Sequence, residues 1–284
     1  MRIDLTTEPG DPERPNEDYV SVALPASGHG GALVLLDGVT PPPGDVGCVH
    51  GVPWFTARLG GAMLELSGSR WDMTLTDCLT AAIGRTAEAH SSTCDLSHVR
   101  TPQATVVAAR WNGSIVEHLV LSDSVLLIEG TDGAVTPVLD ERLGELPEGV
   151  LALRDAVRAM RRGSAERAAA GAEYGRAVEA LRNAAGVEGA FFTAAADPDV
   201  ARRAVTGTSN RADVRAIAAL TDGAARWVEV FGEGNWTECV ALLHKEGTRA
   251  LVRRVRAAEA SDPACTTFPR GKGRDDAAAV LVEL

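Results

Sequence analysis

The sequence predicts an α+β protein in which stacked β-sheets are covered by helices on the outside. Short apolar runs typical of strands cluster toward both ends of the 284-residue chain, and helical patterns lie between them. Asn112-Gly113 and Asp132-Gly133 separate successive apolar runs, and such pairs favour tight hairpins, so neighbouring strands are expected to be antiparallel. The order of elements does not follow a regular strand–helix alternation, which disfavours a parallel α/β sheet.

We expect strands where short apolar runs are bounded by turn residues. Residues 31–36 (GALVLL) are apolar throughout, as in strands that are buried on both faces. The predicted strands are 19–24, 31–36, 104–111, 114–121, 125–129, 134–139, 191–194, 214–220 and 277–283. The predicted helices are 52–66, 74–90 behind a cap at Asp72, one or two helices within 150–185, 223–231 and 235–259.

We expect one domain over residues 1–284, with a helical segment at about 140–186, because the Ser-, Gly- and Pro-rich stretches are typical of loops. The net charge of −11 and the absence of a long basic run disfavour binding to nucleic acid or to an anionic membrane. No apolar run is long enough to span a bilayer, and the first residues show no signal region. We therefore expect a cytoplasmic protein.

Five cysteines, an odd number without CxxC spacing, indicate a reduced compartment. Neither a disulfide framework nor a zinc site is expected from this pattern. His90, Cys94 and His98 lie close together in the sequence, and we interpret them as a polar loop that follows a helix.

Four short acidic stretches lie where predicted strands begin or end. Carboxylates and backbone carbonyls are the ligands that Mg²⁺ and Mn²⁺ prefer, and two such ions about 3.5–4 Å apart can activate water and hold a phosphoryl oxygen. Each stretch alone is typical of an ordinary turn, but together they predict one two-metal site. The stretches are Asn16-Glu17-Asp18, Asp37-Gly38, Asp222-Gly223 and Asp275-Asp276.

The order of these motifs resembles that of the metal-dependent type 2C serine/threonine protein phosphatases, with this chain as a divergent member of bacterial type. The resemblance runs from about residue 14 to the last predicted strand. It rests on Pro15-Asn-Glu-Asp-Tyr19, Leu35-Leu-Asp-Gly38, Thr101-Pro-Gln-Ala-Thr105, Leu121-Ser-Asp-Ser124, Leu220-Thr-Asp-Gly223 and Gly273-Arg-Asp-Asp-Ala277.

The resemblance implies a four-layer α-β-β-α sandwich of two antiparallel sheets flanked by helix pairs. It also implies hydrolysis of phosphoserine and phosphothreonine by a hydroxide that bridges two Mg²⁺ or Mn²⁺ ions, without a phosphoenzyme. The site residues that it implies are Asp37 as the bridging ligand, the Gly38 carbonyl on one ion, Asp222 and Asp275 on the other, and Glu17 and Asp18 directly or through water.

Several positions depart from the family pattern. The general acid often proposed for the family has no counterpart after Asp37, so His50 is the candidate, with a capping or packing role as the alternative. Arg14 is the candidate phosphate-binding arginine, although it stands one residue after the family position. The alternative is that Arg14 is only a charged residue on the surface.

A third metal ion is not expected, because Arg226 stands where the family often has another aspartate. Asp123 of the DS motif remains, and Arg226 is expected either to pair with Asp123 or to help hold the substrate. Asp276 replaces the usual asparagine and adds a negative charge next to Asp275.

Three functions are compatible with these patterns. The first is a phosphatase acting on phosphoserine or phosphothreonine in proteins. The second is a phosphate monoesterase for a small phosphorylated metabolite, with residues 140–186 shaping a closed pocket. The third is a phosphatase-like binding module that has lost catalysis, as suggested by the displaced arginine and histidine. The sequence leaves the preferred ion and the oligomeric state open.

Overall fold

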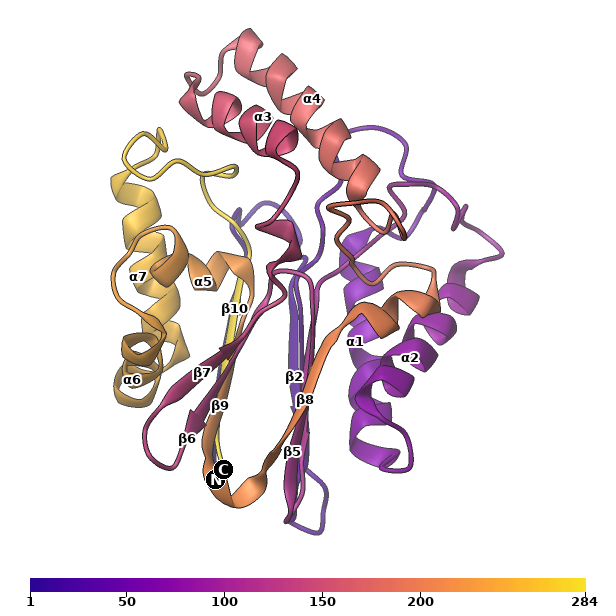
Figure 1. The fold of residues 1–284 in the computed structure, drawn as a ribbon, viewed down its shortest axis with the longest axis vertical. Coiled ribbons are helices and arrows are strands. Elements are labelled where there is room, and N and C mark those ends of the chain that lie inside the picture. The colour runs from indigo at the N-terminus through magenta and orange to yellow at the C-terminus, as the bar shows by residue number, and fades with distance from the viewer.

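Two five-stranded antiparallel sheets lie face to face in the computed structural model, which describes residues 1–284. Helices cover the outer face of each sheet, so the molecule has four layers (Figure 1). The predicted α+β sandwich of antiparallel sheets between helices is therefore confirmed. No helix is long and apolar enough to cross a membrane.

The first sheet has the strand order β1-β10-β9-β6-β7, and the second has the order β2-β3-β4-β5-β8. The expected hairpins at Asn112-Gly113 and Asp132-Gly133 join β4 to β5 and β6 to β7. The strands are β1 (Arg2–Glu8), β2 (Tyr19–Ala23), β3 (Gly31–Leu36), β4 (Val106–Trp111), β5 (Ile115–Leu121), β6 (Val125–Gly130), β7 (Val135–Val138), β8 (Val205–Asn210), β9 (Val214–Leu220) and β10 (Ala277–Glu283).

Helices α1 and α2 pack on the sheet that contains β3, and α5, α6 and α7 pack on the sheet that contains β9. The α-helices are α1 (Val52–Ser69), α2 (Leu75–His90), α3 (Glu148–Ala159), α4 (Ala165–Leu181), α5 (Asp222–Glu229), α6 (Trp236–Glu246) and α7 (Thr248–Ser261). Short 3₁₀ turns are η1 (Glu141–Leu143), η2 (Pro198–Arg203) and η3 (Arg211–Asp213).

The position of β3 between two hydrophobic cores explains why all of its residues are apolar. Successive side chains of a strand point to opposite faces of the sheet. Leu33 and Leu35 pack between the two sheets, whereas Val34 and Leu36 pack against the helices α1 and α2. Each side chain of β3 therefore enters one of two hydrophobic cores, as the sequence pattern predicts for a strand buried on both faces.

Two strands were not predicted because their residues are polar. Strand β1 (RIDLTTE) lies at a sheet edge and pairs along its whole length with β10, so that Arg2 is opposite Glu283 and Glu8 is opposite Ala277. Strand β8 (VTGTSN) extends the other sheet by pairing with β5. Both are edge strands with one side on solvent, where the apolar signal of a strand is weak.

Three local predictions need correction. Residues 191–194 form only isolated bridges, including one between Ala104 and Ala194. The expected helix over 235–259 is two helices, because Gly247 has a φ of 85°, which ends α6. The cap of α2 is Thr74, which forms a capping box with Asp77, whereas Asp72 forms an ion pair with Arg70.

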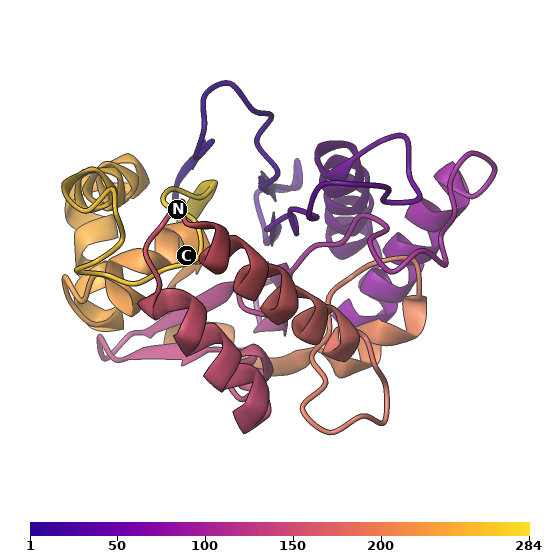
Figure 2. The ribbon, with the colours of Figure 1, turned by 90° about the horizontal axis from the view of Figure 1, so that it is seen from above.

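Helices α3 and α4 form a hairpin outside the four layers. They lie across the end of the sandwich that is opposite the chain termini (Figures 1 and 2). Their few apolar side chains form a small separate cluster with Leu146 and Phe191. The hairpin therefore stands over the strand ends at which the acidic motifs lie.

The packing between the sheets generates a stability prediction. Leu35→Ala removes a fully buried side chain from this core, so the free energy of unfolding should fall by about 2–5 kcal/mol in urea denaturation. Leu5→Ala, at a position that is 42% exposed in the edge strand β1, is the matched control and should cost less than about 1 kcal/mol. Equal losses for the two variants would contradict the assignment of Leu35 to the inter-sheet core.

Candidate metal centre

Five aspartates from distant parts of the sequence converge at the end of the sandwich beneath α3 and α4. Asp18 precedes β2, Asp37 follows β3, and Asp123 lies in the turn between β5 and β6. Asp222 begins α5 directly after β9, and Asp275 lies two residues before β10. The structure therefore brings together Asp18, Asp37, Asp222 and Asp275, which belong to the acidic stretches, and adds Asp123 of the Asp123-Ser124 motif.

Burial and mutual repulsion raise the pKa values of Asp18, Asp37, Asp123 and Asp275. Desolvation raises the pKa of Asp37 well above its ordinary value, and repulsion from Asp222, Asp18 and Asp123 raises it further. The pKa of Asp18 is raised well above its ordinary value for the same two reasons. Desolvation and repulsion from Asp222 raise the pKa of Asp123 and that of Asp275 to about 6. Such a concentration of negative charge is suited to a cation.

The backbone of Asp37 is held by the threonine at the start of the β4 segment. Asp37 N donates to Thr105 Oγ1 at 3.2 Å, and Thr105 N donates to Asp37 O at 2.9 Å. The Thr105 hydroxyl also lies 2.6 Å from the hydroxyl of Ser124 in the Asp123-Ser124 motif. The Thr101–Thr105 motif therefore positions Asp37 directly, and the Asp123-Ser124 motif supports it through Thr105.

Asp18 and Asp222 are linked through the buried Thr221. The Thr221 hydroxyl donates to Asp18 Oδ2 at 2.9 Å and accepts from Ala278 N at 2.8 Å. Gly223 is required by close packing, because a Cβ atom at this position would lie 1.9 Å from Asp276 O. The start of α5 is thus packed directly against the segment that carries Asp275.

The residues present fit divalent cations. Hard cations take carboxylate oxygens, and five carboxylates face one another here. Asp18 Oδ1 is buried and has no hydrogen-bond partner within the protein, which is costly unless a cation or water satisfies it. Asp18, Asp37, Asp222 and Asp275 are the candidate ligands in this cluster, and the roles expected for Glu17 and for the Gly38 carbonyl stay predictions.

Arg226 does not have either of the roles expected for it. Its guanidinium donates to Asp275 Oδ2 at 2.7 Å and to Glu259 Oε1 of α7 at 2.7 Å. No ion pair joins it to Asp123, and the side chain is buried, which removes it from direct contact with a substrate. Arg226 instead orients Asp275 and offsets part of the negative charge of the cluster.

Asp276 and Glu17 make contacts that organise the segment 9–18. Asp276 accepts from Gly10 N at 2.8 Å and from Glu17 N at 2.7 Å, so both of its carboxylate oxygens are engaged by backbone amides. The Glu17 carboxylate accepts a hydrogen bond from the Thr40 hydroxyl. Asp276 therefore anchors residues 9–18 beside the site. Its negative charge strengthens the two hydrogen bonds that it accepts from backbone amides.

A polar pocket of about 570 Å³ is lined by Asp275, Asp276 and Arg14. No hydrophobic residue lines it, and its basic side chains are Arg14, Arg162, Lys272 and Arg274. Lys272 Nζ donates to Asp275 Oδ1 at 2.7 Å and to Thr40 Oγ1 at 3.0 Å. Sequence reasoning missed Lys272, although the segment Gly271-Lys-Gly-Arg274 directly before the acidic pair was a signal for an anion site.

His50 lies in a different group of side chains. Its Nδ1 atom is 3.3 Å from Cys94 Sγ, and its ring stacks on Trp54 with centroids 4.2 Å apart. The geometry therefore gives no support to the role of general acid that was expected for His50. The packing alternative agrees with the stacking on Trp54.

Solved serine/threonine phosphatases share this fold. Stp1 from Staphylococcus aureus has 13% sequence identity and a TM-score of 0.55, over 99% of this chain and 94% of that one. Serine-threonine phosphatase 2C from Toxoplasma gondii has 12% identity and a TM-score of 0.57, over 99% and 94%. The catalytic domain of PstP in complex with two manganese ions has 13% identity and a TM-score of 0.54, over 99% and 97%.

These comparisons establish the fold. The chain spans nearly the whole length of each of the three structures, so the likeness is not confined to one motif or one sheet. At the sequence level, no family model and no curated protein matches the chain. The fold that the resemblance to type 2C phosphatases implied is confirmed, and the chain is a divergent example of it.

The repulsion within the cluster predicts how stability depends on pH. A carboxyl group whose pKa is higher in the folded state than in the unfolded state stabilises the fold only when protonated. For Asp123 and Asp275 this contribution should be lost as the pH rises from about 4 through about 6. The melting temperature of the chelator-treated protein, followed by calorimetry, should therefore decrease over this range and rise again when Mn²⁺ is added near neutral pH.

Asp37→Asn tests the same electrostatics without an assay of activity. Removing one negative charge should raise the melting temperature of the metal-free protein near pH 8 and abolish most of the stabilisation by Mn²⁺. Asp132→Asn, in the exposed hairpin between β6 and β7, should leave both quantities unchanged. A metal-free Asp37→Asn variant that is less stable than the wild type would argue against repulsion at this position.

Proposed function

We propose that this protein is a metal-dependent phosphomonoester hydrolase that acts on phosphoserine or phosphothreonine in proteins. The observation that carries the proposal is that Asp275, a member of the carboxylate cluster, lines a pocket whose other charged side chains include arginine and lysine. A cation site and an anion site side by side are what hydrolysis of a phosphate ester requires. The fold shared with solved phosphatases supports the proposal.

The proposed chemistry divides between the ions and the chain. When bound by Asp37, Gly38, Asp222, Asp275 and Asp18, two Mn²⁺ or Mg²⁺ ions would supply a water of lowered pKa as nucleophile and would offset phosphate charge. Arg226 fixes the orientation of Asp275 by holding one of its oxygens. A side-chain nucleophile is not needed in this scheme.

The basic side chains of the pocket would bind the phosphate group. Arg14 presents a guanidinium, which pairs with phosphate oxygens in a bidentate manner, and Lys272 presents an ammonium group on a side chain that is about half exposed. Lys272 donates to Asp275 in the structure. A bound phosphate would compete with Asp275 for the ammonium group, and a bound cation would compete with Lys272 for the carboxylate. Lys272 is therefore positioned to move from the carboxylate to the substrate as the site fills.

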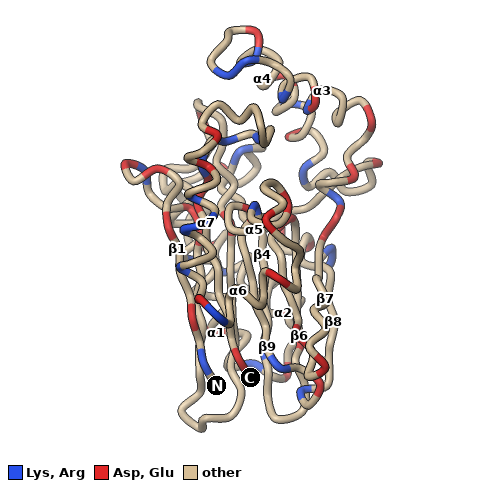
Figure 3. The backbone as a smooth tube through the Cα atoms, turned by 90° about the vertical axis from the view of Figure 1, so that its left-hand side faces the viewer, with Lys and Arg blue, Asp and Glu red and all other residues tan.

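The helical hairpin favours a protein substrate over a closed metabolite pocket. A second pocket of about 560 Å³ shares Arg162 and Gly271 with the first and continues along α3 and α4. Its lining includes three further arginines, and Figure 3 shows basic positions in this part of the molecule. These arginines are Arg154, Arg158 and Arg167. An open basic groove beside the phosphate site suits an extended acidic or phosphorylated segment.

The ion pairs of Asp275 favour a second candidate, a phosphate-binding module without turnover. Arg226 and Lys272 together engage both oxygens of this proposed metal ligand. If these pairs persist in the presence of metal, the second ion lacks one ligand. Activity measurements therefore decide between the two candidates.

Hydrolysis of p-nitrophenyl phosphate with Mn²⁺ is the decisive assay. We expect metal-stimulated turnover that Asp37→Ala and Asp222→Ala each reduce by about 10³-fold or more, because several kcal/mol of charge stabilisation would be lost. Asp132→Ala is the control and should retain wild-type turnover. Absence of turnover in the wild type with either Mn²⁺ or Mg²⁺, together with retained phosphate binding, would favour the binding module.

Charge reversal on α3 tests the substrate class. The double variant Arg154→Glu/Arg158→Glu should raise the KM for an acidic phosphopeptide about tenfold and leave the KM for p-nitrophenyl phosphate unchanged. Arg202→Glu, a strongly exposed position in η2, should change neither value. An equal effect on both substrates would mean that the hairpin acts on the phosphate site itself. A metabolite turned over faster than any phosphopeptide would support the small-molecule alternative.

A further inference from the structure

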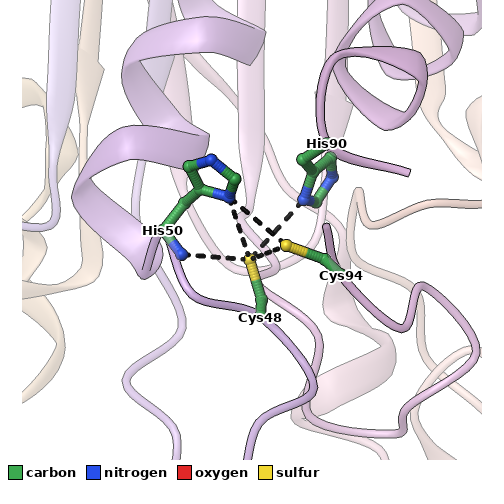
Figure 4. A group of neighbouring side chains, drawn as sticks. All are labelled: Cys48, His50, His90 and Cys94. Carbon is green, nitrogen blue, oxygen red and sulfur yellow. Dashed lines mark hydrogen bonds between the residues drawn. The ribbon is translucent and has the colours of Figure 1, made fainter. Parts of the chain in front are cut away.

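A second group of potential metal ligands lies outside the carboxylate centre. Cys48 and His50 belong to the loop before α1, His90 is the last residue of α2, and Cys94 lies in the turn that follows. One ligand atom from each of the four residues lies within 4.8 Å of every other, and the four side chains point toward a common centre (Figure 4). Folding thus joins two pairs of ligands that are about 40 residues apart in the sequence.

We propose that these four residues bind one Zn²⁺ ion in a structural Cys₂His₂ site. Tetrahedral zinc with bonds of about 2.3 Å to sulfur and about 2.0 Å to nitrogen places sulfur and nitrogen about 3.5 Å apart. The observed distances are 3.7 Å from Cys48 Sγ to His50 Nδ1, 3.5 Å from Cys48 Sγ to His90 Nδ1 and 3.3 Å from Cys94 Sγ to His50 Nδ1. The two sulfur atoms are 3.2 Å apart, somewhat closer than about 3.8 Å for two zinc thiolates.

The donor atoms distinguish this site from the carboxylate centre. Thiolate sulfur and imidazole nitrogen favour Zn²⁺, whereas Mg²⁺ and Mn²⁺ favour oxygen. No carboxylate belongs to the group. Four protein ligands complete a tetrahedral shell, and catalytic zinc sites keep one position open for water or substrate. The composition therefore indicates a structural ion and not a second reaction centre.

The surroundings of the four residues resemble those of metal ligands. His50 N donates to Cys48 Sγ at 3.4 Å, a contact that stabilises a thiolate. The His90 ring is buried, its Nε2 atom has no hydrogen-bond partner, and its Nδ1 atom faces only the sulfur of Cys48. A cation bound at Nδ1 would give this buried ring a stronger partner than a neutral thiol, while Nε2 would stay without one. Trp54 shields the other side of the His50 ring.

The proposed zinc site would fix the loop between the carboxylate centre and α1. This loop starts at Gly38, carries Thr40, which contacts Glu17 and Lys272, and reaches the cluster at Cys48. It is proline-rich and lacks regular structure. Apart from the cluster, hydrogen bonds join it to the segment after α2 at both ends, from Val39 N to Gln103 O at 2.9 Å and from Asp95 N to Gly47 O at 2.7 Å. Zinc would therefore clamp this loop to the end of α2 without entering the carboxylate centre.

The experiment measures metal content and does not depend on catalysis. Untagged protein purified under reducing conditions should contain about one zinc ion per chain by mass spectrometry of the metal. Cys48→Ser and Cys94→Ser should each lower this content at least tenfold. Cys78→Ser, in α2 outside the cluster, and His98→Asn, in the adjacent loop, are matched controls that should retain the ion.

Cobalt substitution of the wild type keeps the test valid if the cysteine variants fail to fold. Replacing zinc with Co²⁺ should give the intense ligand-field bands of a tetrahedral site and a thiolate-to-cobalt charge-transfer band. Chelation of the zinc should also make two further thiols reactive toward a thiol reagent and lower the melting temperature. Both readouts are independent of phosphatase activity, so an inactive protein that holds zinc would still support this site.

Three outcomes would overturn the proposal. The first is a zinc content well below one per chain in the reduced wild type, combined with no tetrahedral cobalt spectrum. The second is zinc that is retained by folded Cys48→Ser and Cys94→Ser, which would indicate an adventitious ion elsewhere. The third is a disulfide between Cys48 and Cys94 in protein kept under reducing conditions. This would mean that the two sulfur atoms lie close together because they form a covalent bond and not because they bind zinc.

Discussion

Repulsion among buried carboxylates is the constraint on which the arrangement of this protein depends. Burial and mutual repulsion raise the pKa values of Asp18, Asp37, Asp123 and Asp275, so the convergence of these groups opposes folding in the absence of cations. Three hydrophobic cores, one between the sheets and one under each helix layer, supply the opposing free energy. The packed cores hold the strand ends in place. The aspartates at these strand ends therefore stay together despite their repulsion.

The structure offsets this repulsion with contacts that reach beyond the site. Arg226 connects Asp275 to Glu259, so the outer helix α7 is linked electrostatically to the carboxylates. Thr105 and Thr221 fix the backbone or the side chain of neighbouring aspartates through hydrogen bonds. Several neighbouring residues therefore share in holding the carboxylates in place. Removal of one of these neighbours should change the pKa values of more than one carboxylate.

The sequence predicted the parts of the fold that apolar periodicity and turn residues encode, including β3, β9, β10 and the two hairpins. It could not predict β1 and β8, because polar edge strands have no periodic apolar signal. The aspartates of the site were found because each follows or precedes a predicted strand. The partner of Arg226 and the placement of His50 were missed, since both depend on contacts between segments far apart in the sequence.

The pairing of β1 with β10 joins the two ends of the chain, and this has a consequence for synthesis on the ribosome. Strands β2 to β5 are made early and are joined by consecutive connections, so most of their sheet can form while translation continues. The other sheet lacks β10, the strand between β1 and β9, until residues 277–283 emerge. Asp275, which lies two residues before β10, therefore joins the other carboxylates only after the other strands have been synthesised, and its share of the charge repulsion arises late in folding.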